Sequence, residues 1–349
     1  MDRNLSVHRY FQELTARHRP RYRFEGKTRD HWQAWRDALL PAVRDTLGAM
    51  PEKVPLHPEI VAEWEEDGLI KQRVLLDVEA ELSAAAYVFR PADAAGPVPG
   101  ILACHGHGPF GKEAMMGNRS SREMRAFIES GNSDYGFQMA QAGYAVIAID
   151  WRGFGERSDA RKPHHVDLAK GRRDPCNLNF LRAVVLGRTV LGMDVHDGMC
   201  ALDYLCAQDF VDADRIGVIG RSFGGTMTTW MTICDERIRA ADVVCYSDRF
   251  AAFGMRDLNF CGSQITPGLF ALCDVPDLQG LIAPRPLLVE IGVHDECFRV
   301  DDALSCHREV ERIYDAAGAR ESLELDLFEG GHAWSGRKTL DFFARHLSA

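Results

Sequence analysis

Short, mostly apolar runs alternate with longer amphipathic segments over the last two thirds of the chain. The apolar runs cover residues 100–104, 144–149, 216–219, 242–246 and 287–291. Strands without polar alternation are buried on both faces, which is what a parallel sheet covered by helices requires. Between them, apolar residues recur at helical spacing, most clearly over 190–206 and over 300–317, where Gly318 follows as the terminating glycine. The pattern predicts an α/β fold with a doubly wound, mostly parallel sheet and flanking helices.

The N-terminal part of the chain follows other patterns. Apolar residues over 31–47 repeat close to every 3.6 positions, and prolines then end the periodicity. Residues 1–68 are therefore predicted to form a helical appendage to a main domain over 69–349. Two successive extended runs, 71–76 and 81–89, predict an antiparallel pair of strands at the start of that domain.

Two long stretches interrupt the alternation of strands and helices. Segments 151–187 and 250–283 are irregular and rich in charged residues, glycine and proline. We expect them to be cap-like insertions that wall a pocket, because they follow strand ends, where open α/β sheets place their sites. Apolar and polar residues alternate over 323–328, which predicts a strand nearer the sheet edge. The pattern over 339–347 predicts a final helix.

Composition narrows the class of protein and of partner. The 349 residues are 46% hydrophobic and 26% charged with a net charge of −10, so the chain is globular, and nucleic acid is not an expected partner. No apolar stretch is long enough for a membrane span, and no signal-peptide pattern begins the chain, so a cytoplasmic location is expected. The ten cysteines form no CxxC pair and are predicted to be reduced and buried. A homo-oligomer is compatible with the sequence, which leaves the oligomeric state open.

The sharpest chemical signal is the hexapeptide at 220–225, GRSFGG. It follows an apolar run and precedes a helix-like segment, the context of the nucleophile elbow G-x-S-x-G. The serine of such a turn has a strained backbone, and small residues two positions on either side let the strand and the helix approach closely. Ser222 is therefore the predicted nucleophile.

A serine hydroxyl needs a base, an orienting acid and donors for an oxyanion. In folds with this serine turn, the acid and then the histidine follow the serine along the chain. That order points to Asp295 after the run 287–291 and to His332 after the run 323–328. Glu296 is the adjacent rival for the acid. The predicted oxyanion donors are two backbone N–H groups, that of Phe223 and that of His107, with the second assigned to within one residue.

Other polar residues admit alternative roles. His105 and His107 form a metal pair if further ligands such as His164 and His165 join them, but the oxyanion loop explains both without a metal. We therefore expect no metal and no cofactor. The carboxylates and arginines at 150–157, together with Asp194 and Asp197, are expected to hold the loop by ion pairs.

Six motifs, taken in order, carry a family resemblance: CHGHG, AIDWRGFGER, LGMDVHDGMCALDYL, GRSFGG, LIAPRPLLVEIGVHD and LFEGGHAW. Over roughly residues 70–349 the chain resembles the α/β-hydrolase superfamily, and more narrowly its acetyl xylan esterase-like, dienelactone hydrolase-related branch. Carried over by motif, the triad of the family falls on Ser222, Asp295 and His332. Dienelactone hydrolases carry cysteine at the elbow, so serine here shifts the expectation toward ester hydrolysis.

The resemblance implies a serine carboxylesterase that forms an acyl-enzyme on Ser222, with a small-molecule ester as substrate and an acetyl ester of a sugar as the first expectation. A C–C bond hydrolase or an aminopeptidase with the same triad is an alternative. A non-catalytic binding protein of the same fold is another, and it predicts a broken triad or oxyanion loop. The identity of the substrate is left open.

Overall fold

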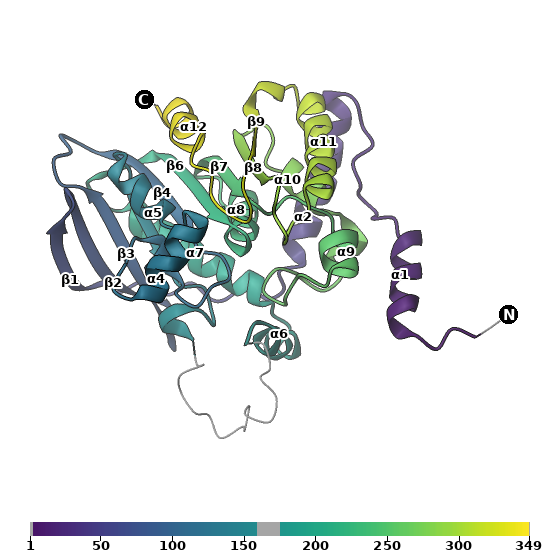
Figure 1. The fold of residues 1–349 in the computed structure, drawn as a ribbon, viewed down its shortest axis with the longest axis horizontal. Coiled ribbons are helices and arrows are strands. Elements are labelled where there is room, and N and C mark those ends of the chain that lie inside the picture. Colours follow the sequence, from purple (N-terminus) through teal and green to yellow (C-terminus); the bar gives the residue numbers. More distant parts are fainter. Residues whose placement is uncertain (1–2, 159–174, 349) are drawn as a thin grey trace, which may run out of the picture.

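The computed structural model describes residues 3–158 and 175–348. Within these residues nine strands form one sheet in the order β1-β2-β3-β5-β4-β6-β7-β8-β9 (Figure 1). The strands are β1 (Glu59–Glu66), β2 (Leu69–Glu79), β3 (Leu82–Pro91), β4 (Val98–Cys104), β5 (Ala145–Ile149), β6 (Val211–Arg221), β7 (Ile238–Val244), β8 (Leu287–Gly292) and β9 (Leu323–Phe328). Neighbouring strands pair antiparallel from β1 through β2 and β3 to β5. All the remaining pairs, from β5 across to β9, are parallel.

Helices cover both faces of this sheet. They are α1 (Val7–Arg17), α2 (Arg29–Asp45), α3 (Lys112–Met115), α4 (Arg122–Gly131), α5 (Tyr135–Gln141), α6 (Pro175–Val185), α7 (Val190–Cys206), α8 (Phe223–Cys234), α9 (Leu269–Leu272), α10 (Val275–Gly280), α11 (Val300–Ala317) and α12 (Thr339–His346). The predicted terminator of α11, Gly318, has φ +70°, in the left-handed region that glycine tolerates.

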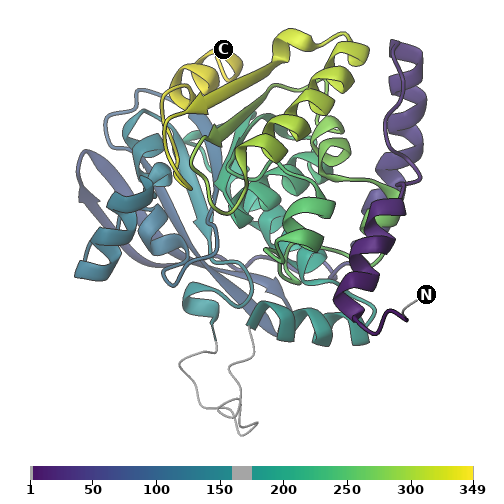
Figure 2. The ribbon, with the colours of Figure 1, turned by 45° about the vertical axis from the view of Figure 1, so that its right-hand side comes forward.

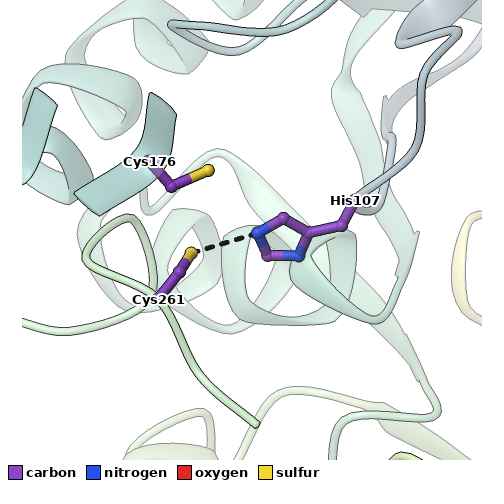
Figure 3. Close-up of side chains that lie close together, drawn as sticks. All are labelled: His107, Cys176 and Cys261. Carbon is purple, nitrogen blue, oxygen red and sulfur yellow. Dashed lines mark hydrogen bonds between the residues drawn. The ribbon is translucent and has the colours of Figure 1, made fainter. Parts of the chain in front are cut away.

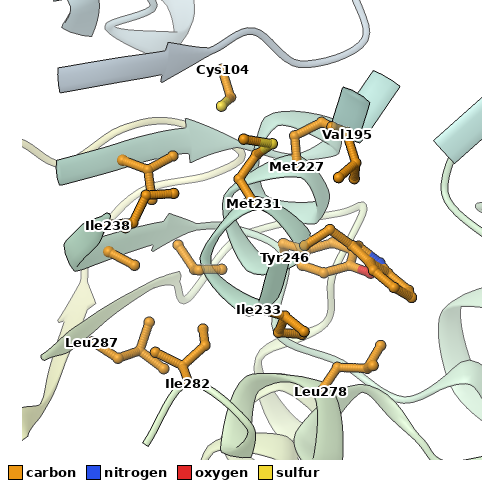
Figure 4. Close-up of a cluster of buried hydrophobic side chains, with 14 of the residues drawn as sticks. Cys104, Val195, Met227, Met231, Ile233, Ile238, Tyr246, Leu278, Ile282 and Leu287 are labelled. Atoms are coloured by element: carbon orange, nitrogen blue, oxygen red, sulfur yellow. The ribbon is translucent and has the colours of Figure 1, made fainter. Parts of the chain in front are cut away.

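Two apolar cores lie on opposite faces of the sheet, as strand β5 makes clear. Successive residues of a strand point to opposite sides, and Ile147 packs into one core while its neighbours Val146 and Ala148 pack into the other. The larger core includes α7, α8, α10 and α11, and Figure 4 shows part of it around Met227 of α8. The smaller core lies under α5 and α12. The predicted doubly wound α/β fold with antiparallel N-terminal strands is therefore confirmed.

The N-terminal segment differs from the prediction in one element. Besides α1 and α2 it contains strand β1, which extends the sheet by pairing antiparallel with β2. All eight residues of β1 are exposed, so no buried face imposed a period-two apolar pattern that sequence reasoning could detect. Helix α2 packs against α9 and α11, while α1 has no buried residue and lies against the π-helix Phe250–Arg256 (Figures 1 and 2).

The two predicted insertions are only partly irregular. Of segment 151–187, residues 159–174 lie outside the described residues, and these include His164 and His165; the rest contains α6 and the start of the connection to α7. Segment 250–283 contains the π-helix and the short helices α9 and α10. In the described parts of the chain, no helix combines the length and apolar character needed to cross a bilayer.

Candidate active site

Ser222 occupies a strained turn between β6 and α8. Its backbone has φ +62° and ψ −121°, a region that residues with a Cβ rarely adopt, and its N–H donates to the carbonyl of Val244 at 2.9 Å. A Cβ at Gly220 would lie 2.4 Å from the carbonyl oxygen of Gly224, and a Cβ at Gly224 would lie 2.0 Å from that of Cys104. The glycines of the motif are thus required by backbone contacts, which is the steric reason for the G-x-S-x-G spacing.

Because the backbone packs so closely at Gly224, a side chain at this position should destabilise the fold. The Gly224→Ala variant is expected to lower the free energy of unfolding by about 1–3 kcal/mol or more, because backbone atoms must move to admit the methyl group. A matched control is Gly96→Ala, where a Cβ meets nothing within 4 Å and the change should stay within about 0.5 kcal/mol. Urea unfolding of both variants measures the difference, and equal stabilities would contradict the steric account.

His332 and Asp295 form a hydrogen-bonded pair at the ends of two neighbouring strands. Asp295 follows β8, His332 follows β9, and His332 Nδ1 lies 2.8 Å from Asp295 Oδ2. The two loops touch, since a Cβ at Gly292 would lie 2.3 Å from the carbonyl oxygen of Gly331. The ring of Phe298 stacks on that of His332 with centroids 5.9 Å apart, which restricts the orientation of the imidazole.

Asp295 is held as a carboxylate. Burial alone would raise its pKa, but the hydrogen bond and charge of His332 and two backbone N–H donors outweigh burial and lower the pKa below its usual value. The donors are Cys297 at 2.7 Å and Phe298 at 3.0 Å, both to Oδ1. Its neighbour Glu296 is exposed, so Asp295 is the carboxylate that faces the histidine.

The loop after β4 packs closely against the turn that carries Ser222. A Cβ at Gly106 would lie 2.7 Å from the carbonyl oxygen of Arg221 and 3.3 Å from the Cβ of Ser222. The buried ring of His105 anchors this loop: Nε2 accepts the N–H of Trp151 at 3.0 Å, which leaves Nδ1 to donate to the carbonyl of Gly106 at 2.9 Å. Both nitrogens of His105 are therefore engaged, and His105 does not pair with His107 as a metal ligand.

Three of the five residues predicted for chemistry, His107, Ser222 and His332, line one cavity of about 330 Å³. Its lining consists of His107, Ser222, Leu258, Asn259, Phe260, Cys261, Gln264, Cys297, Phe298 and His332. Phe223, the second predicted oxyanion residue, opens α8, and N–H groups in the first turn of a helix have no partner within the helix. Sequence reasoning missed the two cysteines of this lining, which lie in loops without a periodic signal.

The loop after β5 is held by the expected ion pairs. Arg152 and Arg157 both pair with the buried Asp197, at 2.6 and 2.7 Å. The sequence analysis missed Lys112, whose buried Nζ lies 2.8 Å from Asp150 and 2.5 Å from Glu156. Burial alone would lower the pKa of Lys112, but these two carboxylates raise it, so the lysine stays charged.

Removal of the Lys112 charge should destabilise the chain strongly. The Lys112→Met variant leaves the fully buried carboxylate of Asp150 without its cation, which should lower the free energy of unfolding by about 3–5 kcal/mol. The control Lys53→Met removes an ion pair with Asp203 whose lysine is 70% exposed, and less than about 1 kcal/mol is expected. Chemical denaturation compares the two, and a similar small loss in both would contradict the prediction.

Comparison with known proteins places the chain in a family. Residues 1–329 match the model described as "Abhydrolase family". The chain belongs to the Abhydrolase family. The resemblance to the α/β-hydrolase superfamily is thereby confirmed.

One relative and two solved structures illustrate the similarity. "Putative hydrolase YtaP" of Bacillus subtilis (strain 168) is 28% identical over 291 residues, which are 82% of this chain and 90% of that protein. The crystal structure of "a putative acetyl xylan esterase" from Bacteroides fragilis NCTC 9343 has a TM-score of 0.76 at 19% identity, covering 93% of this chain and 83% of the other. The glucuronoyl esterase from Solibacter usitatus has a TM-score of 0.67 at 18% identity, covering 92% and 94%. At these identities the structures establish that this Abhydrolase family chain shares their fold.

Proposed function

We propose that the chain is a serine carboxylesterase. The observation that carries the proposal is that Ser222, on its strained turn, and His332, paired with Asp295 at 2.8 Å, line the same cavity. A nucleophile, a base and an orienting acid are the parts that acyl transfer needs.

In the proposed reaction, Ser222 Oγ attacks the ester carbonyl while Nε2 of His332 takes the hydroxyl proton. Asp295 accepts the Nδ1–H of His332, keeps Nε2 free as the base, and stabilises the imidazolium that forms. The backbone N–H groups of Phe223 and His107 donate to the oxyanion. Collapse of the tetrahedral intermediate expels the alcohol, protonated by His332, and a water activated by the same histidine releases the acid.

Several features favour a small ester over the alternatives. The cavity of about 330 Å³ lies at the small end of ligand sites, which suits an acetyl group with one sugar ring. Solved structures that the chain resembles are named acetyl xylan esterase, glucuronoyl esterase and methylesterase, so all three names describe ester hydrolysis. An acetylated sugar is accordingly the proposed substrate class.

A panel of reporter substrates tests the bond type and the acyl length. We expect 4-nitrophenyl acetate to be hydrolysed with a higher kcat/KM than 4-nitrophenyl octanoate, and alanine 4-nitroanilide to be hydrolysed least. Release of acetate from acetylated xylose tests the sugar ester itself. Preferential cleavage of the anilide would favour the aminopeptidase alternative, and no turnover on any member would favour a binding protein.

A further inference from the structure

The wall of the candidate active site contains a second cluster of chemically capable side chains. His107, Cys176 and Cys261 come from the loop after β4, from α6 and from the loop after the π-helix, and their side chains converge (Figure 3). Each offers one ligand atom, and the three atoms lie within 4.8 Å of one another. The Nε2 of His107 and the Sγ of Cys261 are 3.1 Å apart.

We propose that His107, Cys176 and Cys261 bind a thiophilic divalent cation such as Zn²⁺. Two thiolates and one imidazole are a donor set that Zn²⁺ prefers, with Zn–S distances of about 2.3 Å and Zn–N distances of about 2.0 Å. Bonds of these lengths place the two sulfurs of a tetrahedral site roughly 3.8 Å apart and each sulfur roughly 3.5 Å from the nitrogen. The 3.1 Å separation of His107 and Cys261 therefore needs to open slightly, while all three ligand atoms already lie within 4.8 Å of one another. A dication with two thiolates is neutral overall, which suits two cysteines that are 7% and 8% exposed.

The side chains are positioned before any ion arrives. The ring of His107 packs against those of Phe154 and Phe223, with centroids 5.4 and 4.9 Å away. Helix α6 is locked to the loop that carries Cys261, because Gly262 donates its N–H to Asn177 at 2.9 Å. A Cβ at Gly262 would also lie 2.1 Å from that of Phe180, so the approach of the two segments is close. Little reorganisation is therefore needed to bind a metal.

The position of the cluster determines how a metal ion reaches it, and its thiols determine how many protons are released on binding. His107 and Cys261 line the active-site cavity, so an ion reaches the cluster from solvent and its fourth position is open to water. Hydrogen bonding to Cys261 and burial raise the pKa of the Cys176 thiol, so this thiol is protonated without a metal. A thiol of ordinary pKa, about 8.5, is also mostly protonated at neutral pH. Binding then transfers two protons, one from each sulfur, to the buffer as two metal–sulfur bonds form, and the affinity falls as the pH is lowered.

Metal binding to the full chain, kept reduced with a phosphine, tests the proposal independently of esterase activity. Equilibrium dialysis with Zn²⁺ is expected to give about one bound ion per chain, and calorimetry in buffers of different ionisation enthalpy about two released protons. With Cd²⁺, the wild type should show a thiolate-to-metal charge-transfer band in the ultraviolet. The Cys176→Ser and Cys261→Ser variants should lose the band, whereas Cys206→Ser, a half-buried cysteine at the end of α7, should keep it.

Absence of bound Zn²⁺ and of the band in the wild type would overturn the proposal without recourse to any variant. An unchanged band in both Cys176→Ser and Cys261→Ser would also overturn it, since the metal would then lie on other thiols. Thermal unfolding supplies a further readout: Zn²⁺ should raise the Tm of the wild type and of Cys206→Ser but not that of Cys176→Ser.

Discussion

The Ser222→Ala variant is expected to lose about 10³- to 10⁶-fold in kcat, the range found when the nucleophile of a serine hydrolase is removed. In the proposed mechanism the hydroxyl of Ser222 is the group that forms the acyl-enzyme, and alanine supplies no substitute. A residual rate can persist, because the oxyanion donors and the cavity remain. Initial rates with 4-nitrophenyl acetate, at matched concentrations of folded protein, measure the effect.

A second serine provides the control for this variant. Ser247 lies in the loop after β7 and is 1% exposed. Its hydroxyl donates to Gln279 Oε1 at 3.1 Å, and it does not line the cavity. The Ser247→Ala variant should therefore keep a kcat within about tenfold of the wild type. Near-normal turnover by Ser222→Ala would contradict the serine mechanism.

The second large effect is expected from Asp295→Asn, which should lower kcat by at least about 10². In a serine-protease triad the equivalent change costs about 10⁴, because the amide stabilises the wrong histidine tautomer. Here the carboxylate faces Nδ1 of His332 at 2.8 Å, while Glu296 is exposed. Glu296→Gln should accordingly cost less than about tenfold in the same assay, and the reverse ranking would assign the acid to Glu296.

Stability must be measured alongside this pair of variants. Because the pKa of Asp295 is lowered in the folded chain, its ionised form contributes stability at neutral pH that is lost as the pH falls through the folded pKa. Asp295→Asn removes that contribution at every pH, so its unfolding curve should lie closer to that of the wild type in acid than at neutral pH. Correction of kcat for the folded fraction then isolates the catalytic loss.

The parts of the fold that were predictable are those whose cause is local in sequence. Strands β5 and β8 are buried along their whole length, so β5 left an unbroken apolar run and β8 a run interrupted only by Glu290. The turn at Ser222 was detectable because its steric demand falls on glycines two positions away. Strand β1 left no such trace, since every residue in it is exposed.

The parts that were not predictable depend on contacts between distant segments. Lys112 meets Asp150 across 38 residues, and a buried lysine has no signature of its own along the chain. The contact of His107 with Cys261 spans 154 residues and joins two loops. Sequence reasoning weighed a metal pair of His107 with His105 and preferred the oxyanion loop; in the structure His105 is held by backbone groups on both ring nitrogens.

Labelling with a fluorophosphonate probe tests the central claim most directly. An activated serine displaces fluoride from the phosphorus, so the wild-type chain should form one covalent adduct that peptide mapping assigns to Ser222. Heat-denatured wild type and the Ser222→Ala variant should form none, because the reaction needs both the hydroxyl and the folded arrangement around it. Labelling at a different serine, or an unlabelled native wild type, would contradict the account.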